Sequence, residues 1–222
     1  METSRKSKPK SKSAASRIEE HYREHLLTEG AAPASVYIFC KKLGLKESEF
    51  YENFGSFDSI EKAIWVGYIN KVIKRLTSDS EYAKFAVREK ILSFYFSLAE
   101  VLKGDRSFVL FQLKSWKNPG VLPSFLKGFH SSFDEWVRGV IAEGKSSGEI
   151  AKRPYVDERY QHMFWLHLMF ILQFWSNDDS ADFTKTDAAI EKSVNLAFDL
   201  IGKGILDNAI DFGKFLYQNS KN

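Results

Sequence analysis

Two short runs of the sequence match patterns found in catalytic or nucleotide-binding loops. Gly139 to Ser146 reads GVIAEGKS, which fits the phosphate-binding pattern G-x-x-x-x-G-K-S, and Gly144 to Gly148 reads GKSSG, which fits the nucleophile-elbow pattern G-x-S-x-G. Both patterns require a strand immediately before the loop. Here the preceding apolar residues recur at helical spacing, so we interpret both matches as coincidences near the end of a helix.

Two histidine pairs are the other candidates for chemistry. His21 and His25 lie four residues apart, a spacing that could share a metal, but no third ligand is evident nearby and a solvated helix face is favoured. His162 and His167 lie in an apolar stretch, where either could orient a ligand or form a buried hydrogen bond. Because no nucleophile and base have readable spacing, the sequence predicts neither an enzyme nor a cofactor.

The composition is that of an ordinary globular protein. Of 222 residues, 44% are hydrophobic and 27% charged, and 32 Lys+Arg against 29 Asp+Glu give a net charge of +3. The single Cys40 cannot form an internal disulfide and the N-terminus has no apolar signal, so we expect a reducing, cytoplasmic setting. Aromatic residues make up 15% of the chain, which suggests a cavity lined with rings.

The positive charge is concentrated in a basic arm, residues 1–16. This arm has a net charge of +4 and almost nothing apolar to bury, so it should be disordered alone. The remainder of the chain therefore carries a net charge of −1. The cations of the arm are Arg5, Lys6, Lys8, Lys10 and Lys12.

Three short helices are expected after the arm. Ser16 and Glu19 have the spacing of a capping box and start the first helix, and Ser35 is placed to cap the second. Gly44 ends the second helix and leaves a short turn before the third, which is the order of a helix-turn-helix domain. The predicted helices span 17–29, 36–43 and 47–53, within a domain of 17–62.

The rest of the chain, 63–222, also has helical periodicity, with turn-forming residues between the segments. A helix over 57–77 is long enough to connect two domains. No useful strand pattern occurs, so the fold class is all-α: a small helix-turn-helix domain followed by a ligand-binding and dimerisation bundle. Further helices are expected at 82–103, 107–117, 121–145, 156–177, 186–203 and 205–217.

The segment from Gly30 to Ile60 resembles, without gaps, the DNA-binding domain of the TetR family of transcriptional regulators. A weaker match at 142–150, before a helix start at Asp157, is similar to the loop that precedes the dimerising helices of that family. The matching residues of the first segment are Gly30, Ser35, Val36, Phe39, Cys40, Leu43, Gly44, Leu45, Phe50, Tyr51, Phe54, Ser56 and Ile60.

The resemblance implies a homodimer that places two heads one turn of DNA apart and dimerises through about 156–204. Ser35 would cap the second helix and touch phosphate, and the Tyr51 hydroxyl would also contact phosphate. A bundle that binds an apolar effector would change the spacing of the heads and relieve repression. The implied DNA-binding positions are Ser35, Lys41, Lys42, Lys46, Glu47, Ser48, Glu49, Tyr51 and Asn53.

The chain departs from the family pattern at its DNA-binding surface. Lys46 stands where the family usually has a capping serine, and Phe57 where it usually has a lysine. Residues 17–62 contain six basic and nine acidic residues, a net charge of −3, which disfavours binding to a polyanion. Acidic residues in the recognition helix can stabilise its first turn through the helix dipole, or accept a hydrogen bond from cytosine N4. The basic arm can add electrostatic attraction to DNA. These residues are Glu47, Glu49 and Glu52.

Aromatic residues of the bundle suit a pocket for a flat or long-chain apolar effector or lipid, although core packing explains any one of them. The alternative function is a TetR-fold protein that has lost DNA binding and binds a lipid or a protein partner. The candidate pocket residues are Phe94, Phe108, Phe111, Trp116, Phe125, Phe129, Phe133, His162 and Trp165, with Phe170 also on the aromatic helices.

Overall fold

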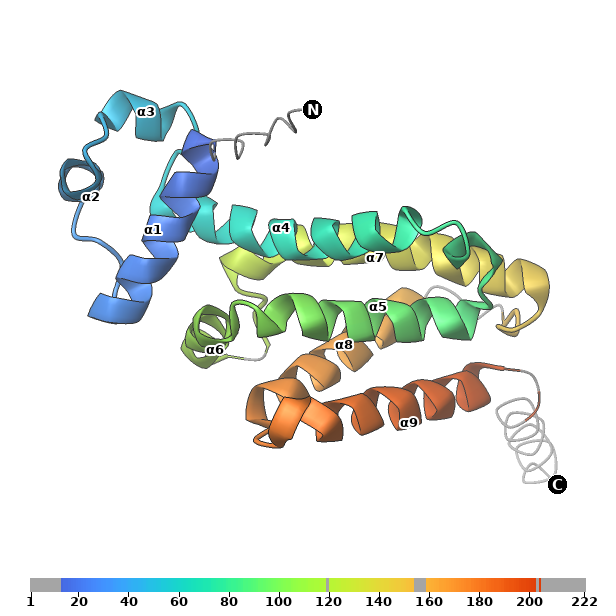
Figure 1. Cartoon of the computed structure of the whole chain (residues 1–222). Coiled ribbons are helices and arrows are strands. Elements are labelled where there is room, and N and C mark those ends of the chain that lie inside the picture. The colour runs from blue at the N-terminus through green and yellow to red at the C-terminus, as the bar shows by residue number, and fades with distance from the viewer. Residues whose placement is uncertain (1–12, 119, 154–158, 203, 205–222) are drawn as a thin grey trace, which may run out of the picture. The chain divides into compact units, whose positions relative to one another are not determined.

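The computed structural model describes residues 13–118, 120–153, 159–202 and 204, and its regular elements in those ranges are all helical (Figure 1). This confirms the all-α class. The chain divides into two compact units. The first contains residues up to 64 together with 107–125, and the second contains 65–106 and the residues from 126 onward.

The first helix, α1 (Ala14–Glu29), begins earlier than predicted. Ser13 caps it, because the Ser13 hydroxyl accepts a hydrogen bond from the Ser16 amide at 3.2 Å. The prediction that Ser16 is the cap was therefore wrong: two alanines after Ser13 favour helix and carry it through Ser16. Residues 14–16 of the predicted arm are helical, while residues 1–12 lie outside the described residues.

The next two helices follow the predicted order. Ser35 caps α2 (Val36–Leu43), accepting from the Ile38 amide at 3.2 Å, and Gly44 ends it with a φ of 67° that favours glycine. The recognition helix α3 (Glu47–Tyr51) is two residues shorter than predicted. The Asn53 side-chain amide donates to the main-chain carbonyl of Glu49 at 2.8 Å and so gives a hydrogen-bond partner to a carbonyl in the last turn of the helix.

Rings from four segments form the core of this helix-turn-helix head. Phe57, the first residue of α4 (Phe57–Thr77), stacks on Tyr22 of α1 with ring centroids 5.4 Å apart. The same ring lies 5.5 Å from Phe39 of α2 and 5.6 Å from Phe50 of α3, both edge-on. Phe57 thus packs against every helix of the head.

The second unit is a bundle of longer helices. The predicted helix over 82–103 is divided, because Phe85 has an extended backbone and Glu89 accepts from the Ala86 amide at 2.8 Å to start a new helix. The predicted helix over 205–217 and the helix start at Asp157 lie outside the described residues. The observed elements are η1 (Tyr82–Lys84), α5 (Val87–Lys103), α6 (Arg106–Ser115), α7 (Ser124–Ser147), α8 (Tyr160–Asn177), η3 (Ala181–Phe183) and α9 (Thr184–Ile201).

Two arginines hold the C-terminal ends of α8 and α9. Arg106 donates to the carbonyls of Trp175 and Asp178, each at 3.0 Å. The buried Arg153 donates to the carbonyls of Ile201 at 3.0 Å and Gly202 at 2.7 Å. These contacts satisfy carbonyls that have no partner within the helix, and they place cations where the helix dipole is negative.

The phosphate-loop and nucleophile-elbow patterns lie within α7 as far as Ser147, with Gly148 just after its end. The backbone of residues 139–146 is therefore occupied by helical hydrogen bonds and cannot wrap a phosphate. This confirms that the two motif matches are coincidental. Among the described helices, none is long and apolar enough to cross a membrane.

Candidate functional site

The nine implied DNA-binding residues all lie on or beside α2 and α3; seven are exposed, and Ser35 and Glu49 are partly buried. Tyr51, at the end of α3, is 54% exposed. Ser35 combines capping of α2 with partial exposure at the start of that helix. The head therefore brings the implied positions together on one pair of helices.

Lys46 and Glu49, two of the implied DNA-binding residues, form a hydrogen bond at the start of α3. The Lys46 amide donates to Glu49 Oε2 at 2.9 Å, so Glu49 provides one half of a capping box and supports the structural interpretation of this carboxylate. Lys46 supplies no side-chain cap. Glu47 and Glu52 are exposed and have no ion-pair partner among the described residues.

The lysines of α2 are already engaged within the head. Lys42 lies 3.7 Å from Glu29, and the Lys41 ammonium lies 5.9 Å from the centre of the Tyr37 ring. Tyr37 and Ile38, which are 57% and 54% exposed, were missed by the sequence analysis. Their positions could have been found, because the buried residues of α2 already fix which side of the helix faces outward.

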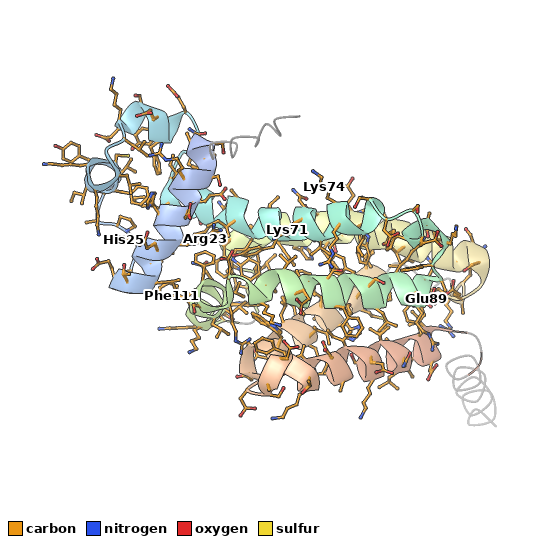
Figure 2. The ribbon with its side chains drawn as sticks, in the orientation of Figure 1. Arg23, His25, Lys71, Lys74, Glu89 and Phe111 are labelled. Carbon is orange, nitrogen blue, oxygen red and sulfur yellow. The ribbon has the colours of Figure 1, made fainter. Side chains whose placement is uncertain are left out.

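The histidines of α1 lie beside a groove between α1 and α2. His21 Nδ1 lies 3.5 Å from a carboxylate oxygen of Glu24. His25 lies on the same helix (Figure 2) and is half-buried. The groove has a volume of about 430 Å³ and a floor that includes Phe39. No group of three metal-ligating side chains occurs among the described residues.

The candidate pocket residues fall into two sets, one in each compact unit. In the second unit, Phe94 and Phe133 have centroids 5.5 Å apart, and Trp165 lies 6.0 Å from Phe133 and 6.3 Å from Phe129. His162 is exposed on α8. The set in the first unit is Phe108, Phe111, Trp116 and Phe125.

His167 connects three helices of the second unit. Its Nδ1 lies 3.3 Å from the Tyr95 hydroxyl of α5, and its Nε2 lies 2.8 Å from the Ser193 hydroxyl of α9. Burial lowers the pKa of His167 to about 4. The histidine is therefore neutral near pH 7. Of the two roles expected for it, the structure shows the partly buried hydrogen bond.

Asp178 organises the turn between α8 and α9. Its carboxylate accepts from the amide and hydroxyl of Thr186 at 2.8 and 2.6 Å, and from the amide and hydroxyl of Ser180 at 2.8 and 2.6 Å. Burial opposes the charged form, but these hydrogen bonds outweigh it and hold the pKa of Asp178 well below its usual range. The turn thus fixes the pairing of the two helices.

An apolar surface, here called the α8–α9 face, is exposed in the single chain. Leu166 is 54% exposed, and the other members recur at helical spacing along one side of each helix. The two helices contact each other along the hairpin. The members of the face are Met163, Leu166, Phe170 and Phe174 on α8, and Leu196 and Leu200 on α9.

Comparison with known families decides the classification. Residues 90–216 match the family model described as tetracyclin repressor-like, C-terminal domain. The chain belongs to the TetR family. Together with the helix-turn-helix head, this makes it a TetR-type transcriptional regulator. A search of curated proteins finds no match.

Solved structures show the same fold at low sequence identity. A TetR-family regulator from Syntrophomonas wolfei is 14% identical, with a TM-score of 0.69 over 86% of this chain and 97% of that one. FadR from Bacillus subtilis, solved with stearoyl-CoA, is 19% identical, with a TM-score of 0.59 over 86% and 98%. A TetR-family protein from Rhodococcus RHA1 is 15% identical, with a TM-score of 0.53 over 88% and 100%.

Proposed function

We propose that this TetR-family chain is a homodimeric repressor whose binding to DNA is relieved by an apolar effector. The observation that carries the proposal is the α2–α3 surface, where Ser35 caps α2 and the Tyr51 side chain is exposed beside the aromatic core of the head. A rigid platform of this kind positions phosphate contacts and presents a helix to the major groove.

Dimerisation is proposed through the α8–α9 face. Six exposed apolar side chains at helical spacing on two adjacent helices are more than a monomer usually exposes, which supports an interaction surface here. Pairing this face with its own copy would give a four-helix interface, with Leu166 and Phe170 of one protomer against apolar side chains of the other. The dimer supplies the two heads that a palindromic site requires.

The charge of the head sets the expected mode of DNA binding. With six basic and nine acidic residues over 17–62, each head gains little from general attraction to phosphate. Selectivity would instead come from direct contacts, in which Glu47 or Glu52 accepts a hydrogen bond from cytosine N4. We therefore expect weak non-specific binding and a short list of specific sites.

Effector control is proposed for the aromatic residues of the bundle. Phe129, Phe133 and Trp165 contact one another in the second unit, and we expect a flat or long-chain apolar molecule to bind by separating such rings. The likeness to FadR solved with stearoyl-CoA supports a fatty acyl compound as the first class to test. The effector would act by favouring a conformation whose head spacing no longer matches two major grooves.

A second candidate function follows from the departures at the head. The Phe57 ring is committed to the core, so the position of the family's lysine offers no cation to DNA. Glu47 of α3 and Glu52, which directly follows it, are exposed carboxylates with no ion-pair partner in the part of the chain that the structure describes. Both facts favour a TetR-fold protein that binds a lipid or a protein partner in place of DNA.

Selection of genomic DNA fragments on the purified full-length protein, at near-physiological salt, separates the two functions. The regulator predicts enrichment of one palindromic site and its loss in a Ser35→Ala, Tyr51→Phe double variant. An exposed position of α1 outside the head's DNA-binding helices, changed by Thr28→Ala, serves as the matched control and should retain the site. Absence of any enriched sequence from a folded protein would contradict DNA binding and support the second candidate.

The basic arm is tested in the same selection. A variant that lacks residues 1–12 keeps the Ser13 cap of α1 and so preserves the first helix. If the arm supplies phosphate contacts, the variant should recover the same palindrome with lower affinity and a weaker salt dependence. An unchanged affinity and salt dependence would show that the arm is not used on DNA.

A further inference from the structure

Residues 21–25 of α1 read HYREH, which fits the helical zinc pattern H-x-x-E-H. In such patterns the two histidines bind one metal ion, because residues four apart lie one turn apart on the same side of a helix. Unlike the two loop patterns, this one meets its structural requirement, since it falls in the interior of a helix. The head therefore holds two imidazoles at chelating spacing.

Both imidazoles line the groove of about 430 Å³ between α1 and α2. The His21 side chain is 40% exposed and His25 is half-buried, so neither ring is fully solvated. The buried Phe39 and the partly buried Leu43 form the apolar part of the lining. Rings held against packed side chains lose less freedom when they bind a metal, which favours a site here over a solvated helix face.

The Glu24 carboxylate lies beside one nitrogen of His21, with 3.5 Å between His21 Nδ1 and Glu24 Oε2. A carboxylate in this position favours the tautomer with its proton on Nδ1, which leaves the lone pair of Nε2 for a metal. The His25 ring forms no hydrogen bond with the residues that the structure describes, so it is also available as a ligand.

The charged side chains that line the groove favour a cation. They are Glu24, Glu29 and Lys42, so two carboxylates stand against one ammonium, and the ammonium lies 3.7 Å from Glu29. In the described ranges no third histidine, cysteine or acidic residue completes a metal site, so water would fill the remaining coordination positions. Such an open site binds its metal reversibly, unlike a closed structural site with four protein ligands.

We propose that His21 and His25 bind a divalent transition-metal ion of the class that imidazole ligands prefer, with Zn²⁺ as the ion to test first. Glu24 is a positioning residue for His21. A metal that bridges two successive turns stabilises α1, whose Tyr22 packs against Phe39 of α2 in the core of the head. The inference stands apart from the proposed function, because the head can hold the metal whether or not it binds DNA.

The test is isothermal titration calorimetry of Zn²⁺ into untagged, full-length protein from which metal has been removed with a chelator. The wild type should bind one Zn²⁺ per chain at this site. His21→Gln and His25→Gln each remove one ligand and should weaken that binding at least about tenfold. The matched control is His162→Gln, at an exposed histidine of α8, which should bind Zn²⁺ as the wild type does.

A further variant tests the positioning role of Glu24. Glu24→Gln should weaken Zn²⁺ binding about threefold, less than for a buried carboxylate beside a ligand, because the Glu24 side chain is 70% exposed. Glu52→Gln, at an exposed glutamate of the head that does not line the groove, is its control. Unchanged affinity in Glu24→Gln would overturn the positioning role.

Nuclear magnetic resonance of protein labelled with ¹³C in its histidine rings identifies the ligands in the wild type. The chain contains five histidines, and Zn²⁺ should shift the ring signals of His21 and His25 alone. This measurement decides the question even where a variant fails to fold. Shifts at other histidines in place of these two, wild-type affinity in folded His21→Gln or His25→Gln, or no response to millimolar Zn²⁺ would each overturn the site.

Discussion

The helices α3 and α8 both bury aromatic side chains on their inner sides, but the side chains on their exposed sides differ. Phe50 of α3 is buried among rings of the head, much as Phe164 of α8 is buried within the bundle. On the exposed side, α3 carries the Glu47 carboxylate and is followed by that of Glu52, whereas α8 carries Leu166 and its apolar neighbours. The buried residues, which recur at helical spacing, determine the fold. The exposed residues determine what each surface can bind.

The largest expected effect comes from placing a charge on the α8–α9 face. Leu166→Glu would bury an unpaired carboxylate at the proposed interface, so the protein should become a monomer, with dimer affinity reduced at least about a thousandfold. Sedimentation velocity over a range of concentrations measures the change. Leu27→Glu, at an exposed leucine of the head, is the control and should remain dimeric. A Leu166→Glu protein that remains a dimer would show that the α8–α9 face is not the dimer interface.

Replacing Phe57 by the family's usual lysine should have the next largest effect. The change removes a ring that contacts Tyr22, Phe39 and Phe50, so the head should lose about 2–3 kcal/mol of unfolding free energy even though it gains a cation. Denaturant unfolding followed by far-ultraviolet circular dichroism reports this loss. If Phe57→Lys is as stable as the wild type, Phe57 is not part of the core that supports α3.

The third effect is a loss of stability in acid that depends on His167. An unfolded histidine binds a proton near pH 6.5, but the folded His167, with a pKa of about 4, does not. Stability should therefore be complete above pH 6.5 and fall as the pH decreases toward 4, by about 2 kcal/mol after allowance for partial exposure. Unfolding measured from pH 7 to 4 gives the slope.

The controls for this pH dependence lie on the same protein. His167→Gln should flatten the stability profile between pH 6.5 and 4, whereas the exposed His162→Gln should leave it unchanged. Asp178 contributes in a lower range, since its lowered pKa means that its stabilisation is lost only below the usual pKa of a free carboxyl. A wild-type profile that is flat down to pH 4 would contradict the neutral, hydrogen-bonded state of His167.

The smallest effect is expected at the cap of α3. Glu49 already accepts from the Lys46 amide, so Lys46→Ser would complete the capping box and should stabilise the head by about 0.5–1 kcal/mol. Lys46→Ala is the control, because it removes the lysine without adding a capping hydroxyl, and it should not raise the free energy of unfolding. A destabilised Lys46→Ser protein would mean that the lysine contributes to the head in a way its exposure does not indicate.

Much of the fold could be predicted from local sequence. The 57–77 helix and the Ser35 cap were confirmed because apolar period and capping chemistry are encoded within a few residues. The start of α1 was placed wrongly because Ser13 and Ser16 are both good caps. The contacts of Arg106 and Arg153 with distant helix ends were not predictable, since no local pattern specifies a partner about 50 to 70 residues away.

The candidate sites show the same limit. Family spacing placed the nine residues of the α2–α3 surface on one pair of helices. The aromatic set was less well defined, because helical spacing marks a residue as inward-facing without telling which compact unit it joins, and Phe108 and Phe133 fall in different units. The hydrogen bonds of Asp178 to Ser180 and Thr186 had no signal that the sequence analysis used, because only the folded turn brings these groups together.

The most direct test of the central claim is mass photometry of the full-length protein mixed with the genomic fragment enriched in selection, at near-physiological salt. We expect a single complex of two chains per palindrome for the wild type and for Leu27→Glu, and no complex for Leu166→Glu. A folded wild-type dimer that leaves the palindromic fragment free, while Leu166→Glu shows the expected monomer, would contradict DNA recognition by the acidic head and leave dimerisation standing.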